Sequence, residues 1–194
     1  MRLGYLVFIF LSMLISNITA QEISDFSLKN VDGKTISLRE YKNVKGFIIV
    51  FTCNHCPFAQ FYPDRLNRLY KKYKAKGIPL LAVNPMDTLV YAEENREDMR
   101  KVAERNSFLF PYLLDDNQKI AKKFKAKRTP EAFIIWKEKN SFFIKYQGAI
   151  DDNGAEPEKV VNHFLENALV ELLSGKQVTE PETTAVGCKI NYRK

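Results

Sequence analysis

The chain has 194 residues, enough for one domain with a sizeable hydrophobic core. Its formal net charge is +7, but 30 basic residues are interleaved with 23 acidic ones, so no nucleic-acid-binding patch is indicated. Only three cysteines are present, too few for a scaffold held together by several disulfides.

The first twenty residues have the pattern of a secretory signal peptide. Met1-Arg2 gives a positive start, residues 3–18 are almost wholly apolar, and Ala20 is a small residue at the expected cleavage point. The apolar run is shorter than the roughly 20 residues that a membrane-spanning helix needs. We therefore expect cleavage between Ala20 and Gln21, export to the periplasm or beyond the cell, and no stable membrane insertion afterwards. A retained membrane anchor is the alternative.

The rest of the chain alternates between strand and helix patterns. Residues 26–38 alternate around Asp32-Gly33, which predicts a β-hairpin. Residues 46–52 are apolar without interruption, as in a strand buried on both faces. Apolar residues at three- and four-residue spacing then predict an amphipathic helix from just after Pro57 to about Lys76.

The elements predicted after that helix are a strand at 78–83, a charged helix at 89–105, a short helix ending near 124, a strand at 132–136, a pairing strand at 142–147 and a helix at 157–173. This order predicts a mixed α/β sandwich. We expect residues 21–175 to form the domain and residues 176–194 an irregular C-terminal tail.

Cys53 and Cys56 lie two residues apart, where the buried strand gives way to the helix. Unpaired N–H groups and the helix dipole favour a thiolate at such a position. We expect Cys53 to be the exposed nucleophile, because it gains most from the helix start. Cys56, one turn in and more buried, is expected to resolve the mixed disulfide.

Two other interpretations of this cysteine pair stay open. The pair is a purely structural disulfide in one of them, and half of a zinc site in the other. A zinc site needs two further ligands, and His55, His163 and Cys188 are the remaining cysteine or histidine candidates. His163 falls in the last helix pattern, which favours a structural role.

A strand, a C-x-x-C motif at a helix start and a Thr-Pro ahead of a later strand resemble the thioredoxin fold. Over roughly residues 22–174 the order resembles the redoxin branch of that fold, called alkyl hydroperoxide reductase/thiol-specific antioxidant-like (AhpC/TSA) or peroxiredoxin-like. The resemblance is carried by the N-terminal hairpin, Phe51–Pro57, the helix at 89–105, Phe110–Asp115 and Thr129–Ile134. It implies a three-layer sandwich with a mixed central sheet, a redox-active Cys53–Cys56 pair, and no bound cofactor or metal.

The resemblance also implies roles for residues near the pair. Pro130 matches the family's cis-proline, which faces the C-x-x-C motif and leaves backbone near Thr129 free to pair with a substrate chain. His55 directly precedes Cys56, where a histidine in strongly oxidising relatives helps to stabilise the nucleophile's thiolate. The alternative for His55 is a solvent-exposed loop histidine.

The sequence departs from two patterns of the wider fold. A true peroxiredoxin carries P-x-x-x-T-x-x-C and an arginine near the later strand, whereas Val50 stands three residues before Cys53 and Pro130 lies near the expected arginine, with Arg128 close by. Thioredoxin carries a buried acid in the strand before its cysteines, and residues 47–52 contain none. Proton transfer to Cys56 therefore needs water or a carboxylate from elsewhere.

These observations predict an exported thiol–disulfide oxidoreductase that exchanges disulfides with protein thiols or a thiol reductant through Cys53 and Cys56. The alternatives are a thiol-dependent peroxidase and a non-catalytic redox-sensing or binding module on the same scaffold. Cys188 is interpreted as a third redox thiol, an intermolecular bridge, a transient partner of Cys53, or a packed and inert cysteine.

Overall fold

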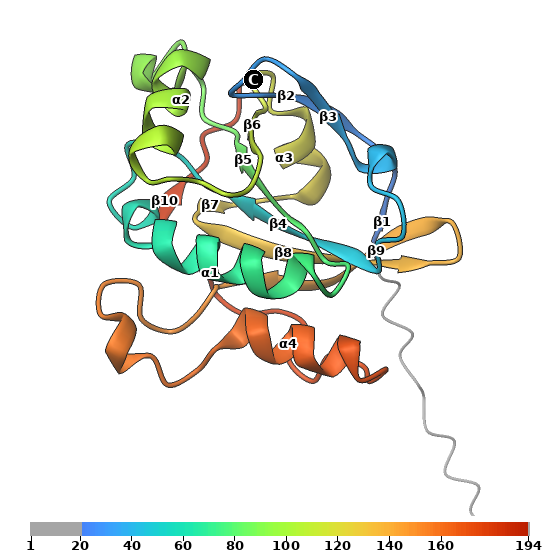
Figure 1. Cartoon of the computed structure of the whole chain (residues 1–194). Coiled ribbons are helices and arrows are strands. Elements are labelled where there is room, and N and C mark those ends of the chain that lie inside the picture. The colour runs from blue at the N-terminus through green and yellow to red at the C-terminus, as the bar shows by residue number, and fades with distance from the viewer. Residues whose placement is uncertain (1–20, 194) are drawn as a thin grey trace, which may run out of the picture.

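The structure, a computed structural model, describes residues 21–193, so the expected signal peptide lies outside the described residues. An eight-stranded mixed sheet has the order β1-β9-β8-β4-β5-β6-β2-β3 (Figure 1). Its strands are β1 Glu22–Ile23, β2 Ser27–Asn30, β3 Thr35–Ser37, β4 Gly46–Phe51, β5 Leu80–Asn84, β6 Tyr112–Leu114, β8 Glu131–Glu138 and β9 Ser141–Gly148. Strands β4, β5 and β6 run parallel, and the other pairs are antiparallel.

Within residues 21–193, four α-helices lie on both faces of this sheet. They are α1 Pro63–Lys74, α2 Arg96–Arg105, α3 Lys119–Phe124 and α4 Phe164–Leu173. Short 3₁₀ helices occupy Leu38–Glu40, Ala59–Phe61, Ala92–Glu94 and Pro157–Lys159. None of the helices within residues 21–193 has the length and apolar character needed to span a membrane.

Strand β4 alternates its side chains between two hydrophobic cores, as a strand buried on both faces must. Phe47, Ile49 and Phe51 pack on the side covered by α3. Ile48 and Val50 pack on the side covered by α1, α2 and α4. The resulting thioredoxin-like three-layer sandwich, with its N-terminal β2–β3 hairpin and late β8–β9 hairpin, confirms the predicted fold class.

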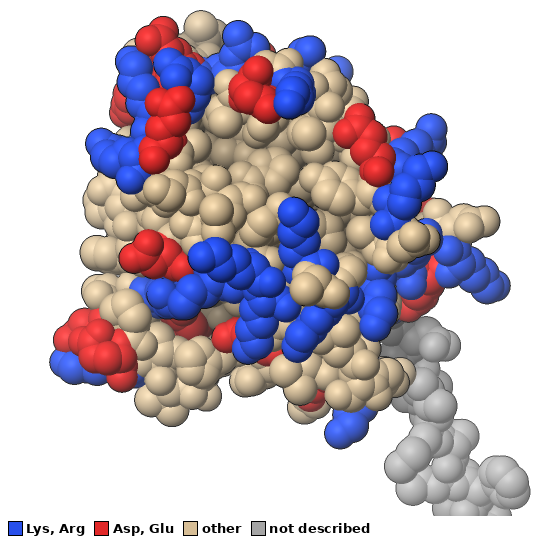
Figure 2. All heavy atoms as spheres, viewed as in Figure 1, with Lys and Arg blue, Asp and Glu red and all other residues tan. Residues whose placement is uncertain are grey.

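Charges of both signs cover the surface around α2, whereas Lys and Arg side chains gather over α1 (Figure 2). In α2, Lys101 lies 3.2 Å from Glu97 and 2.9 Å from Asp98, so part of the basic charge there is paired within the helix. Exposed pairs of this kind contribute little to stability.

Three predicted helices begin later than the sequence pattern indicated. Helix α1 begins at Pro63 rather than just after Pro57, because a proline is well suited to the first helical position and the preceding residues form a 3₁₀ turn. Helix α2 begins at Arg96, where the Asn95 side chain caps it by accepting from the Asp98 N–H. Helix α4 begins at Phe164, after a separate 3₁₀ turn.

The C-terminal tail is more ordered than predicted. Strand β10 (Cys188–Lys189) pairs antiparallel with β7 (Arg128–Thr129), just ahead of β8. Ile190 is 2% exposed and packs within the core on the α3 side of the sheet. In Figure 1 this red segment runs past β7 toward α3. The expectation of an irregular tail was therefore wrong around Cys188.

Candidate active site

The C-x-x-C motif follows β4 at the centre of the sheet. The Thr52 N–H donates to the Val83 carbonyl of β5 at 2.9 Å, so the chain leaves the sheet only at Cys53. Cys53 is 5% exposed and Cys56 is fully buried. Cys56 is the more buried of the two, as predicted, but the expectation of an exposed Cys53 was wrong for this state of the protein.

Burial dominates the electrostatics of Cys53 and raises the pKa of its thiol to about 12. The Glu94 carboxylate also raises this pKa, whereas hydrogen bonds from the Thr129 hydroxyl and from the N–H groups of Cys56 and His55 lower it. The predicted support from a helix start is missing, because α1 begins only at Pro63. Burial therefore favours the protonated form of the Cys53 thiol in this state.

The disulfide in the structure links Cys56 to Cys188, not to Cys53. Their Cα atoms are 6.0 Å apart, within the usual range for a disulfide. Cys53 is left as a free thiol. The expected Cys53–Cys56 disulfide is thus absent from this state, and the third cysteine, Cys188, is bonded to the motif.

Thr129 lies against both motif cysteines, and its peptide bond to Pro130 is cis. The Thr129 hydroxyl is 3.1 Å from the Cys53 Sγ, and its carbonyl oxygen is 3.1 Å from the Cys56 Sγ. Thr129 is fully buried. Three of the predicted site residues, Cys53, Cys56 and Thr129, therefore meet at one point, and Pro130 follows Thr129 directly in the chain.

Glu94 is a site residue that the sequence analysis did not single out. It lies in the 3₁₀ turn that leads into α2 and is fully buried. Its carboxylate accepts the Asn54 N–H at 2.9 Å, the His55 N–H at 2.8 Å and the Asn84 Nδ2 at 2.6 Å. It is therefore a buried acid beside Cys53, and it fixes the backbone between the two cysteines.

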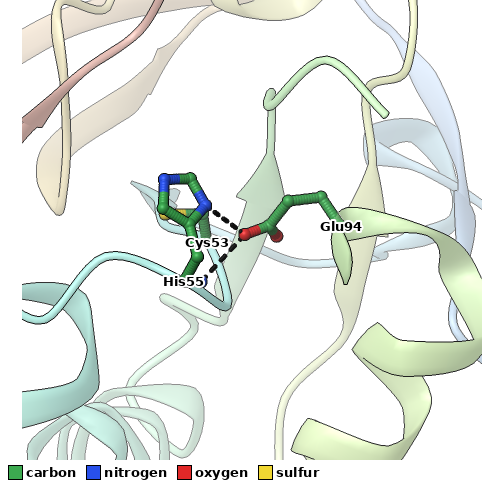
Figure 3. A group of neighbouring side chains, drawn as sticks. All are labelled: Cys53, His55 and Glu94. Atoms are coloured by element: carbon green, nitrogen blue, oxygen red, sulfur yellow. Dashed lines mark hydrogen bonds and ion pairs between the residues drawn. The ribbon is translucent and has the colours of Figure 1, made fainter. Parts of the chain in front are cut away.

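His55, the fifth predicted residue, also binds Glu94. Its Nδ1 lies 2.6 Å from a carboxylate oxygen (Figure 3). Its ring stacks on Tyr91 with centroids 4.2 Å apart. The side chain is 22% exposed, so it is not a free loop histidine. His163 lies at the exposed start of α4 and takes no part in the site.

Cys53, His55 and Glu94 bring their possible ligand atoms within 4.8 Å of one another, the spacing of a metal site (Figure 3). The two carboxylate oxygens already accept N–H donors from the Asn54 and His55 backbone and from Asn84. A metal would have to break these bonds, which are costly to lose in a buried position. The geometry therefore favours a role for Glu94 in positioning the loop.

Two hollows border the motif. One of about 360 Å³ lies between α1 and α2 and is lined by Cys53, Asn54, Arg105 and Tyr112 among others. The second, of about 410 Å³, lies beside Pro130, and its lining combines apolar residues such as Phe58 and Phe61 with the acidic Asp151 and Asp152. The first gives a reacting molecule a place beside Cys53, and the second gives one beside Pro130.

Comparison with known proteins gives one family. The AhpC/TSA family matches residues 19–152. The thiol–disulfide oxidoreductase ResA of Halalkalibacterium halodurans is 24% identical over 146 residues, which cover 75% of this chain and 74% of that protein. ResA of Bacillus thuringiensis strain Al Hakam is 27% identical over 118 residues, 61% of this chain and 64% of that protein.

Solved structures show the same fold. A conserved, uncharacterised protein from Geobacillus kaustophilus is 34% identical with a TM-score of 0.79, over 90% of this chain and 92% of that one. A hypothetical protein from Sinorhizobium meliloti is 27% identical with a TM-score of 0.80, over 90% and 94%. A putative DsbE thiol:disulfide interchange protein from Chlorobium tepidum is 21% identical with a TM-score of 0.61, over 79% and 96%.

Proposed function

The chain belongs to the AhpC/TSA family, and on this basis we propose that it is an exported enzyme that exchanges disulfides through Cys53 and Cys56. Its relatives named ResA place it among thiol–disulfide oxidoreductases. The observation that carries the proposal is the meeting of both motif sulfurs at Thr129, each 3.1 Å from one of its oxygens.

The exchange begins at Cys53. Its thiolate attacks one sulfur of a substrate disulfide, the substrate's other sulfur leaves as a thiolate, and a mixed disulfide forms. A Cys56 thiolate then attacks the Cys53 sulfur, which releases the second substrate sulfur and closes the Cys53–Cys56 disulfide. Before this, Cys56 must be reduced, because the structure holds it in a disulfide with Cys188.

Cys53 must also gain solvent before it reacts. A pKa of about 12 leaves on the order of one thiol in 10⁵ ionised at pH 7. Since burial is the largest contribution to this pKa, a small outward movement of the motif loop lowers it most effectively. Thr129 then serves as the hydrogen-bond donor that holds the thiolate.

The groove beside Pro130 fits a protein as substrate. Phe58 and Phe61 line it and are each 44% exposed, and Val186 on its other side is 67% exposed. Apolar side chains in a hollow next to the reactive sulfurs suit an extended peptide around a target cysteine. The partners proposed are accordingly protein thiols or disulfides, or a thiol reductant.

Export is the second part of the proposal and rests on the residues before Gln21. The positive start, apolar run and small residue at Ala20 are the pattern of a cleaved signal. The test is N-terminal sequencing of protein recovered from the extracytoplasmic fraction. A first residue of Gln21 supports export with cleavage, and an intact Met1 in the cytoplasmic fraction contradicts it.

Thiol-dependent peroxide reduction is the competing function, and membership of the AhpC/TSA family is what favours it. Val50 replaces the motif threonine that would precede Cys53 by three residues. We expect peroxide to oxidise the reduced protein little faster than an ordinary low-pKa thiol.

One pair of assays separates these enzymes from a non-catalytic module. The protein, with an excess of dithiothreitol as the reductant, is mixed with a synthetic peptide closed by one disulfide, and the rate is compared with that of dithiothreitol alone. The reduced protein is mixed separately with hydrogen peroxide in stopped flow. Catalytic reduction of the peptide with slow peroxide consumption supports the proposal. A peroxide rate constant of roughly 10⁶ M⁻¹s⁻¹ or more makes it a peroxidase, and the absence of turnover with both makes it a binding or sensing module.

A further inference from the structure

The chain on either side of Cys188 is bound to the domain by contacts that do not involve sulfur. Before it, the Thr183 N–H donates to the Gln147 carbonyl at 3.0 Å, and the Thr183 hydroxyl accepts the Ala149 N–H at 2.9 Å. After it, the Ile190 N–H donates to a backbone carbonyl at 3.0 Å, and the Ile190 side chain is buried in the core.

The last described residue is also fixed. Arg193 forms an ion pair with Asp87, with its Nε 2.6 Å from one carboxylate oxygen. The Arg193 N–H donates to the Gln118 side chain, which is itself buried. Because none of these contacts involves sulfur, we expect them to hold the Cys188 thiol beside Cys56 when the Cys56–Cys188 bond is reduced.

The tail occupies the backbone edge at Thr129. Strand β10 pairs antiparallel with β7, so that Cys188 faces Thr129 directly. Gly187 approaches so closely that a Cβ on it would overlap the Thr129 carbonyl group. A substrate chain was expected to pair at this backbone edge. The protein's own C-terminal segment occupies it instead and places Cys188 opposite Thr129.

Resting on the proposed function, we propose that Cys188 is a third redox-active thiol that takes the disulfide over from Cys53. The Cys188 thiolate attacks the Cys56 sulfur of a Cys53–Cys56 disulfide. The Cys56–Cys188 bond forms as the Cys53–Cys56 bond breaks, and Cys53 leaves as a thiolate. Cys188 gives up one proton and Cys53 takes one up. Two sulfurs are oxidised before and after the step, so no external oxidant is needed.

Two features of the site favour the product of this step. Burial stabilises the protonated form of the departing Cys53 thiol, which removes the thiolate that would attack in reverse. The anchored tail keeps Cys188 against Cys56 at a high effective concentration. Cys188 is partly exposed, whereas Cys56 is fully buried, so Cys188 is the sulfur that an outside thiol reaches.

The test follows the disulfides in time. Fully reduced protein is mixed with the synthetic disulfide-closed peptide, quenched with acid, alkylated and mapped by mass spectrometry without reduction. We expect the Cys53–Cys56 disulfide to appear first and then to decay into Cys56–Cys188 as Cys53 becomes alkylatable. Cys188→Ser should stop at Cys53–Cys56, with several-fold less alkylated Cys53 among oxidised chains.

Two variants of the C-terminal tail test whether the position of Cys188, and not only its thiol, is needed for the transfer. Gly187→Ala keeps all three cysteines but pushes β10 off Thr129, so it should also accumulate Cys53–Cys56. Lys189→Ala, at an exposed position of the same strand, should behave as the wild type. Circular dichroism establishes that each variant is folded.

The outcomes distinguish this proposal from the one on which it rests. A Cys53–Cys56 disulfide that persists in the wild type, with Cys188 alkylated throughout, overturns the role of Cys188 and leaves the proposed function intact. The absence of every disulfide after mixing overturns both.

Discussion

Replacing Glu94 by glutamine should make Cys53 more reactive, although the variant removes a contact of the active site. The Glu94 carboxylate raises the pKa of Cys53, because a negative charge beside the sulfur opposes a second one. With the Cys56–Cys188 disulfide in place, Cys53 is the free thiol, so its alkylation reports this effect directly.

The size of the effect follows from the distance. The sulfur of Cys53 and a carboxylate oxygen of Glu94 lie within 4.8 Å. At that distance two unit charges repel by about 0.9 kcal/mol in water and about 3.5 kcal/mol at an effective dielectric constant of 20. Removing the repulsion raises the thiolate fraction by about 5- to 400-fold. Because nucleophilicity falls as the pKa falls, the alkylation rate should rise by about 2- to 20-fold.

The assay is iodoacetamide alkylation at pH 7, with the modified cysteine identified by mass spectrometry. Glu93→Gln is the matched control, because Glu93 is the exposed neighbour of Glu94 in the same turn. The NH₂ group of a glutamine cannot accept the hydrogen bonds that one Glu94 oxygen now accepts from N–H donors. Glu94→Gln should therefore also lower the free energy of unfolding by about 1–3 kcal/mol. A rate for Glu94→Gln equal to or below that of Glu93→Gln, in folded protein, would refute the electrostatic reasoning.

Three further predictions concern the surroundings of the motif. Thr129→Val removes a hydroxyl that lowers the pKa of Cys53, so alkylation of Cys53 should slow, and an unchanged rate would contradict that role. Phe58→Ala should raise the KM for a protein disulfide by roughly 2- to 5-fold, since a half-exposed phenylalanine offers about 0.5–1 kcal/mol of apolar contact, and leave the KM for a small disulfide unchanged. Arg193 lowers the pKa of Asp87, so their ion pair stabilises the folded protein above the ordinary carboxyl pKa of about 3.9, and this stabilisation is lost as the pH falls below that value. The melting temperature should therefore fall less between pH 7 and pH 3 in Arg193→Ala than in the wild type.

The parts of the fold that local patterns encode were predictable. The buried run before Cys53, the hairpin around Gly33 and the pairing of 132–136 with 142–147 are all present in the sheet. Each depends on side-chain periodicity or turn chemistry within a few residues of sequence. The cis bond before Pro130 came from the family resemblance, since proline alone does not favour it.

The parts that depend on long-range contact were missed. Glu94 reaches the motif from 39 to 40 residues away and looks like any other acid in a charged segment. Cys188 pairs with Cys56 across 132 residues, and no periodicity connects them. The one signal available for Glu94 was indirect: the strand before the cysteines lacks the acid that thioredoxin carries, so a carboxylate had to come from elsewhere.

The central claim is that Cys53 is the atom that attacks a substrate disulfide. Cys56→Ser removes the resolving sulfur, so a covalent complex with the disulfide-closed peptide should accumulate. Mass spectrometry of that complex should find the peptide attached to Cys53. In the same assay, Cys53→Ser should carry no peptide on a cysteine of the C-x-x-C motif. Attachment of the peptide to Cys188 alone, with Cys53 unmodified, would contradict the account.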